Sequence, residues 1–180
     1  MSTKIPAGLF FAMAILAPSL AAPQAFVAPR VLQDSLWESL VGNWEGWSES
    51  SLGRFDDDVE IEWGLQRQFL IIRVTSKTDK VTYKTTGYCT MDSTTGKITG
   101  YWFDTLRRVL HSTEVREGNK FTIRWEGGAA ATERTYEKMS KDKWVGSFRD
   151  VDASGKPVEG RCVLLRQTKS SKKAAALKKL

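Results

Sequence analysis

The sequence predicts an all-β protein, an antiparallel up-and-down β-barrel of about ten strands preceded by a short helix. Strand-like segments follow one another from residue 40 to residue 166 with no helical pattern among them. Turn-forming residues recur about every 8–12 positions, and connections this short favour pairing in chain order. The stretch opens with Gly42-Asn43-Trp44-Glu45-Gly46, where glycine lets a first strand bend and tryptophan fills the closed end of a barrel. A β-sandwich is the alternative, because alternation alone does not separate the two folds.

The predicted helix covers residues 31–40. Leucines recur there every four residues from Leu32, and Ser35 with Glu38 has the spacing of a capping box. A short amphipathic helix in front of a barrel can plug its closed end, and Trp37 would add to that plug.

The strands are predicted from alternation and from the turns between them. The clearest is 58–64, where Val59, Ile61 and Trp63 alternate with two glutamates. Polar loops that contain glycine separate several of the others. The ten predicted strands are residues 40–51, 58–64, 68–77, 82–91, 97–105, 109–116, 120–126, 132–139, 144–150 and 158–166.

The first 25 residues are predicted to be a signal peptide and not part of the barrel. Lys4 precedes an apolar run over 7–17, and small residues and prolines follow it. The run is shorter than the roughly 20 residues of a membrane span. The 180-residue chain thus divides into a signal peptide (1–25), one barrel domain (31–168) and a tail (169–180).

Residues 25–30 suggest a second targeting step. Ala25-Phe26 followed by Ala28 and Pro29 resembles the junction used by algae whose plastids derive from a red alga, where a transit segment begins with Phe. This resemblance implies entry into the secretory pathway followed by import into the plastid. A secreted or periplasmic protein is the alternative.

The net charge of +6 belongs to the two ends of the chain. Lys4 and five tail lysines account for six of the 27 basic residues, and the remaining 21 equal the 21 acidic residues. A neutral domain argues against nucleic-acid binding, which needs positive charge on the folded surface. We favour a solvated, disordered tail over weak contact with a membrane or an acidic partner. The tail lysines are Lys169, Lys172, Lys173, Lys178 and Lys179.

No metal site and no cofactor are predicted. His111 is the one histidine, and Cys89 and Cys162 lie too far apart in sequence to form a metal-binding pair. We expect His111 at the surface or at a hairpin edge. An oxidising compartment would permit a disulfide between the cysteines, but we favour two separate buried thiols.

Several short motifs follow one another along the predicted barrel. They are Gly42-x-Trp44-x-Gly46, Glu62-Trp63-Gly64 running to Phe69-Leu70, Gly87-Tyr88 leading to Asp92 and Gly96, Gly100-Tyr101-Trp102-Phe103-Asp104, and Arg134-Thr135-Tyr136. In this order they resemble the lipocalin-like, calycin-type small barrels over about residues 38–167. The closer similarity is to a family best known from bacteria whose domain has no assigned function. The family implies a barrel with a central pocket and no agreed activity.

Nitrobindin-like haem proteins are a more distant resemblance. They open with Gly-x-Trp-x-Gly-x-Gly, but Ser48 stands here in the place of the last glycine. Their haem-binding histidine lies near the end of the domain, where this chain has residues 161–167 and no histidine. Haem binding is therefore not expected.

Aromatic residues are the first group of candidate ligand contacts. Tryptophan supplies a large contact area and one N–H donor, which suits flat lipophilic ligands. The same rings can instead fill a narrow barrel completely, and the sequence leaves these alternatives open. The predicted contacts are Trp44, Trp63, Phe69, Trp102 and Trp125.

Arg134 and Tyr136 are the polar candidates, since they share one face of a strand. A guanidinium and a phenol together can hold a carboxylate, as in fatty-acid-binding barrels, where the pair lies on the last strand. The alternative is an Arg134 on the outer wall, paired with Glu60, Glu62 or Glu133.

The predicted function is non-catalytic binding of a small hydrophobic molecule, such as a lipid or pigment, inside the barrel. An isomerase, cyclase or pigment lyase is the enzymatic alternative, with Asp104 as a weak catalytic candidate beside Arg134 and Tyr136. Asp104 can instead end a strand and cap a turn. A structural or assembly factor that docks through its lysine tail is the third alternative. The oligomeric state stays open.

Overall fold

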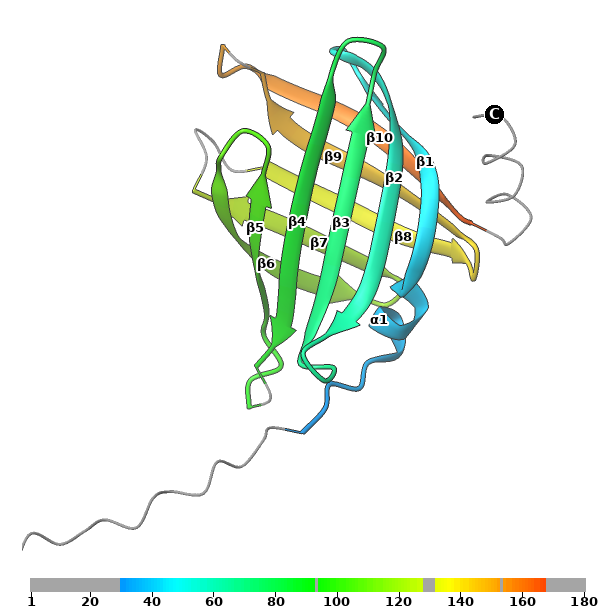
Figure 1. The fold of residues 1–180 in the computed structure, drawn as a ribbon, viewed down its shortest axis with the longest axis vertical. Coiled ribbons are helices and arrows are strands. Elements are labelled where there is room, and N and C mark those ends of the chain that lie inside the picture. Colours follow the sequence, from blue (N-terminus) through cyan, green and yellow to red (C-terminus); the bar gives the residue numbers. More distant parts are fainter. Residues whose placement is uncertain (1–29, 93, 128–131, 153, 168–180) are drawn as a thin grey trace, which may run out of the picture.

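The computed structural model describes residues 30–92, 94–127, 132–152 and 154–167, and it is a closed barrel of ten antiparallel strands. Each strand pairs with its neighbours in the chain, and β1 pairs with β10 to close the ring (Figure 1). The predicted barrel is confirmed, and the sandwich alternative is wrong. The elements are α1 (Ser35–Leu40), β1 (Gly42–Ser50), β2 (Gly53–Gly64), β3 (Phe69–Lys77), β4 (Thr82–Met91), β5 (Ile98–Asp104), β6 (Val109–Glu117), β7 (Lys120–Glu126), β8 (Thr132–Ser140), β9 (Lys143–Val151) and β10 (Pro157–Arg166).

The helix α1 is shorter than predicted, and a different residue caps it. Asp34 has extended backbone angles, and its Oδ1 accepts a hydrogen bond from the backbone N–H of Trp37 at 2.8 Å. The capping box predicted from Ser35 was therefore wrong by one residue. The segment before Asp34 lies outside the helix, and the Leu32 N–H donates to the carbonyl of Arg67 in the β2–β3 turn.

The strand β2 begins at Gly53 and not at residue 58. The early part contains acidic residues at 56–58, so it shows no apolar alternation, yet Asp57 occupies an inward position in register with Val59 and Ile61. The sequence pattern did not identify residues 53–57 as part of the strand, because the inward residue at position 57 is an aspartate and not an apolar residue. Gly53, at φ 115°, allows the tight turn from β1.

The glycine of the opening motif is required where β1 meets β10. A Cβ on Gly46 would lie 1.8 Å from the carbonyl oxygen of Val163, so no larger residue fits without moving the backbone. The motif opens the first strand, as predicted, but the predicted reason for the glycine was a bend, whereas the structure shows a close approach of two strands.

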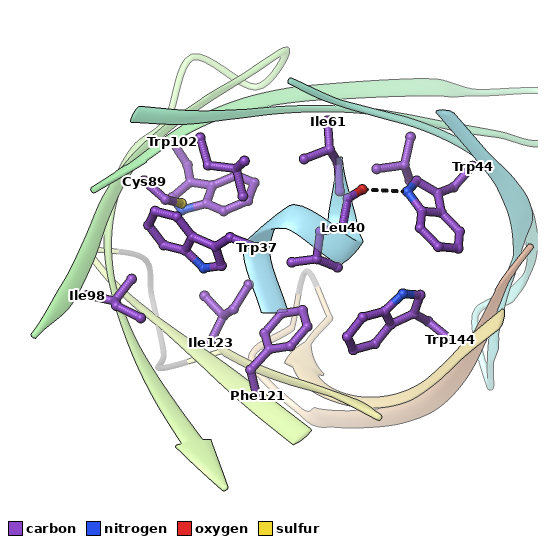
Figure 2. Packing of buried hydrophobic residues seen from close by; sticks show 12 residues of the cluster. Trp37, Leu40, Trp44, Ile61, Cys89, Ile98, Trp102, Phe121, Ile123 and Trp144 are labelled. Carbon is purple, nitrogen blue, oxygen red and sulfur yellow. Dashed lines mark hydrogen bonds between the residues drawn. The ribbon is translucent and has the colours of Figure 1, made fainter. Parts of the chain in front are cut away.

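The helix α1 plugs one end of the barrel, as Figure 2 shows. Trp37 is fully buried, and its ring centroid lies 5.8 Å from that of Trp63 on β2. The guanidinium of Arg116 also lies over the Trp37 ring, with Cζ 5.2 Å from the centroid. Arg116 also forms ion pairs with Asp34 and Glu114, so the plug is tied to β6 by charge as well as by packing.

A second cluster joins the helix to the first and last strands. The Trp44 Nε1–H donates to the carbonyl oxygen of Leu40 at 2.8 Å (Figure 2). The Arg166 guanidinium lies over the Trp44 ring, with Cζ 4.1 Å from the centroid. It donates to the carbonyl oxygens of Val41 at 2.8 Å and Ser39 at 2.6 Å. One side chain therefore satisfies the end of α1 and holds β10 against β1.

Cys89 on β4 and Cys162 on β10 are both buried and both free. They are the two separate thiols that the sequence favours over a disulfide. Burial raises the pKa of Cys162 to about 11, so this thiol stays protonated at neutral pH.

The predicted signal peptide, the start of the transit segment and the lysine tail lie outside the described residues, and they stay predictions. Within the described ranges, no helix is long and apolar enough to cross a membrane.

Arg166→Met tests the cluster that joins α1 to the barrel. We expect the free energy of unfolding to fall by about 3 kcal/mol, because two carbonyls lose a charged donor and Trp44 loses a cation–π contact. Urea denaturation followed by tryptophan fluorescence measures it. Arg161→Met is the matched control, since Arg161 forms an exposed ion pair with Glu49 that contributes about 0–1 kcal/mol. Equal losses in both variants would contradict the assignment.

Candidate ligand-binding cavity

The barrel encloses a cavity of about 470 Å³. Its wall begins at Leu40 and Trp44 beside α1, and it ends at Leu106 and Asp152 at the opposite rim. This volume lies within the range of about 300–1,000 Å³ that is typical of small-molecule sites. The sequence left open whether the rings fill the barrel or line a cavity. In the structure, the barrel is hollow between α1 and the opposite rim.

Arg134 and Tyr136 on β8 both line this cavity. The guanidinium of Arg134 lies over the ring of Phe148 on β9, with Cζ 4.9 Å from the centroid. Tyr136 stacks on Phe121 of β7, with centroids 5.2 Å apart and planes inclined by 22°. Aromatic neighbours therefore hold both polar groups in place against the inner wall.

The glutamates proposed as outer-wall partners of Arg134 are engaged elsewhere. Glu62 accepts from Arg73 at 2.6 Å, and Glu133 accepts from Arg124 at 2.6 Å. Within the described ranges, Arg134 has no ion pair at all. The outer-wall alternative for Arg134 was wrong, because β8 alternation places Glu133 outside and Arg134 inside.

Burial and charge set the protonation of this pair. Burial raises the pKa of Tyr136 to about 12, so the phenol is neutral at physiological pH and can donate a hydrogen bond. Burial opposes the charge on Arg134, but the Tyr136 phenol beside it and the more distant Asp57 keep the pKa of the guanidinium above its usual value. The cavity thus holds a permanent cation next to a neutral donor.

Asp57 on β2 is the buried acid of the wall. It is 6% exposed, and Ser76 on β3 donates a hydrogen bond to its Oδ1 at 2.5 Å. Both residues line the cavity. The Ser76 hydroxyl satisfies this carboxylate in part, and no ion pair within 4.0 Å joins Asp57 to Arg134 in the described structure.

Trp102 on β5 forms a flat aromatic part of the wall. Its ring covers Gly87 of β4, where an added Cβ would lie 2.5 Å from ring carbons. Its Nε1–H donates to Ser112 Oγ at 2.9 Å, and Trp125 meets it edge-on at 5.4 Å and 73°. The ring is therefore fixed on three sides, and Trp125 extends the apolar wall toward the rim.

Trp63 and Phe69 do not line the cavity, unlike the other predicted contacts. Trp63 lies under the plug, where its Nε1–H donates to Glu38 at 3.3 Å and Arg67 covers its ring at 4.5 Å. Phe69 alternates with the fully buried Leu70 and so faces outward. The sequence does not show which end the helix fills, which conceals the position of Trp63, and apolar residues on both faces of β3 conceal the outward direction of Phe69.

Asp104 ends β5 and caps the turn to β6. Its Oδ1 accepts from the backbone N–H groups of Leu106 at 2.9 Å and Arg108 at 3.0 Å. Its Oδ2 accepts from the Arg108 side chain at 2.7 Å and from the Tyr83 hydroxyl at 3.1 Å. Both oxygens are engaged, so the capping role predicted as the alternative agrees with the structure.

Sequence reasoning missed several polar residues of the wall, among them Asp57, Ser76, Tyr83 and Arg108. One of them extends an inward alternation that was recognised. Asp57 continues Val59 and Ile61, and that pattern was the signal that could have found it. Arg108 lies in a turn, where alternation gives no signal.

Gly87→Ala tests the fixed position of Trp102. Within a strand this change ordinarily stabilises by about 0.5–1 kcal/mol. Here we expect a loss of about 1–3 kcal/mol, because the new methyl group overlaps a ring that cannot move. Urea unfolding measures it, and Thr86→Ala is the control on the same strand. Stabilisation by Gly87→Ala would show that the ring is not held against β4.

The raised pKa of Tyr136 predicts a pH dependence of stability. The unfolded chain ionises this phenol near pH 10, before the folded chain does near pH 12. Its stabilisation is therefore complete below about pH 10 and is lost between about pH 10 and 12. In that window, Tyr136→Phe should reduce the slope of the unfolding free energy against pH by up to about 1.4 kcal/mol per pH unit, which corresponds to one proton. Tyr101→Phe, on the outer wall, is the control, and an unchanged slope in Tyr136→Phe would contradict burial of the phenol.

No protein-family model matches the sequence, and no curated protein matches it either. Among solved structures, the barrel is similar to the S-type phycobiliprotein lyase of Guillardia theta, with 12% identity, 73% of this chain and 90% of that chain covered, and a TM-score of 0.54. A de novo designed fluorescence-activating β-barrel shares 14% identity over 75% of this chain and 100% of that chain, with a TM-score of 0.40. The similarity to the lyase supports the barrel fold, and the relationship to the bacterial family and to nitrobindins stays a prediction.

Proposed function

We propose that the barrel binds one small, mostly apolar molecule that carries an anionic group, and that it does so without catalysis. The observation that carries this proposal is the Arg134 guanidinium, which lines an otherwise largely apolar cavity and has no ion pair within the described ranges. Lipids and pigments with a carboxylate are the ligand classes that fit.

The cation is the reason to expect an anion. A guanidinium cannot lose its proton to escape burial, so its charge must be compensated by water or by a partner. Two parallel N–H donors match a carboxylate, and the neutral Tyr136 hydroxyl adds a third donor on the same strand face. Asp57 repels an anion from the β2–β3 side, which favours its placement against β8.

The apolar wall sets the rest of the ligand. Trp102, Trp125 and Phe121 offer flat surfaces, and Trp44 and Trp144 close the cavity toward the plug. Fixed aromatic faces favour a planar or extended hydrocarbon body. A carboxylate on such a body would combine both kinds of contact.

The groups that could act on a bound ligand are placed for binding. Tyr136 and Cys162 are held in their protonated forms, and both oxygens of Asp104 accept hydrogen bonds from the β5–β6 turn and from Tyr83. His111 lies on β6 in register with Tyr101, on the outer face. An isomerase or lyase would need Asp104 to converge with Arg134 and Tyr136 on the cavity, so we favour a carrier.

Arg134→Met tests the proposal with two fluorescent probes, an anilinonaphthalene sulfonate and an uncharged phenylnaphthylamine. We expect the Kd of the sulfonate to rise by about 10- to 100-fold, because one charge-assisted contact of about 1.4–3 kcal/mol is lost. The Kd of the uncharged probe should change by less than about threefold, because the apolar wall is intact. Fluorescence titration measures both.

Arg124→Met is the matched control, since Arg124 lies on the neighbouring strand β7 and pairs with Glu133 outside. Equal effects of both substitutions on the sulfonate would refute the role of Arg134. If neither probe binds, and native mass spectrometry of purified protein shows no lipophilic ligand, the carrier function itself is wrong.

A further inference from the structure

The middle of one side of the outer wall carries no formal charge. The strands β4, β5 and β6 lie side by side in the barrel (Figure 1). Between Lys84 near the open rim and Glu117 at the plug end, their outward residues are threonines, aromatic residues, valines and one histidine. We call this surface the uncharged face. It consists of Thr86, Tyr88, Thr90, Thr99, Tyr101, Phe103, Val109, His111, Thr113 and Val115.

The other described walls are charged on the outside. The strand β2 alone presents Asp56, Asp58, Glu60 and Glu62 outward. Ion pairs link neighbouring strands around the rest of the barrel, whereas none of the described ion pairs includes a residue of the uncharged face. The linking pairs are Arg73–Glu62 across β2–β3, Arg124–Glu133 across β7–β8, Arg149–Glu159 across β9–β10 and Arg161–Glu49 across β1–β10.

Large apolar side chains stand exposed on the uncharged face. The exposed fraction is 57% for Tyr101, 49% for Phe103 and 59% for Val109, so a large part of their apolar surface is in contact with solvent. The rings are already ordered, since Tyr88 meets Phe103 edge-on at 6.4 Å and Tyr101 meets His111 at 5.2 Å. Ordered aromatic rings on a surface without charge are the composition found at the centre of protein interfaces.

We propose that the uncharged face is the interface of a homodimer. A partner with a charged surface, or an anionic membrane, would bury its charges against a face that has none to match them. A second copy of the same face brings no unmatched charge. Two-fold symmetric dimers are the commonest assemblies and require this kind of self-complementary patch.

The size of the face limits the area that the dimer can bury. Three strands about 4.8 Å apart and about eight residues long span roughly 14 by 26 Å, or about 370 Å². That is within the range of apolar patches on monomers and well below the roughly 800 Å² per partner of a standard interface. We therefore expect a weak dimer that forms at high protein concentration. It leaves the cavity free, because the face lies on the wall and the cavity opens at the rim.

Sedimentation velocity of the full-length chain over about 1 to 500 μM tests the inference. We expect the weight-average mass to rise from 20.2 kDa toward twice that value. The double variant Tyr101→Lys with Phe103→Lys should stay monomeric throughout, because pairing would bury four like charges. A loss of self-association of at least about 30-fold is expected.

Met139→Lys with Leu165→Lys is the matched control. These side chains are 57% and 47% exposed and lie on β8 and β10, away from the uncharged face. The control should dimerise like the natural chain. A natural chain that is monomeric throughout, or a control that is disrupted to the same extent, overturns the inference.

Probe binding is the independent readout. Both double variants should bind the sulfonate probe as the natural chain does, which shows that the barrel is folded and that the cavity is unaffected. If Tyr101→Lys with Phe103→Lys binds the probe normally and still dimerises, the interface lies elsewhere and the inference is wrong. Failure of the carrier function would appear instead as absent probe binding in every variant, with the dimer intact.

Discussion

The contact on which the barrel depends is the one between Arg166, Trp44 and the last turn of α1. A closed sheet needs its first and last strands to meet, and these strands lie more than a hundred residues apart in sequence. Backbone pairing alone would leave the end of α1 with unsatisfied carbonyls inside the structure. The Arg166 guanidinium donates to two of them and packs on Trp44, so the same side chain stabilises both the closure of the barrel and the end of the plug.

The plug also determines where the barrel is hollow. Trp37, Trp63 and Leu40 fill the end beside α1, while the rest of the wall has no element to cover it from inside. Glycine at position 87 then lets Trp102 lie flat against the wall instead of projecting across the barrel. The cavity is thus the space that remains when the bulky rings are either gathered at the plug or laid along the strands.

Alternation in the sequence predicts most of this, because an antiparallel barrel assigns each strand residue to one of two faces. It placed Trp44, Trp102 and Trp125 inside, and it put Arg134 and Tyr136 on one face. It failed where the answer depends on the third dimension. Trp63 belongs to the inward-facing set of β2, as predicted, but it lies under the helix and not in the cavity. Asp57 also faces inward, but a charged residue at this position did not suggest an inward side chain. Alternation shows which residues of β8 share a face, but it does not show which face points inward when the strand has no apolar alternation. The inward direction of the Arg134 side chain therefore became clear only from the structure.

Arg134 is the residue on which the proposed function depends. Its guanidinium forms no ion pair in the described structure, and the Tyr136 phenol and the more distant Asp57 offset the cost of its burial and keep its pKa above the usual value. Arginines on the outer wall, such as Arg73, Arg124 and Arg161, form ion pairs with carboxylates of neighbouring strands. Asp57 shows that the interior accepts a carboxylate as well, yet it bonds Ser76 and does not form an ion pair with Arg134. Arg134 is less buried than Asp57, so of the two groups we infer that the cation is the one that an anionic ligand would contact.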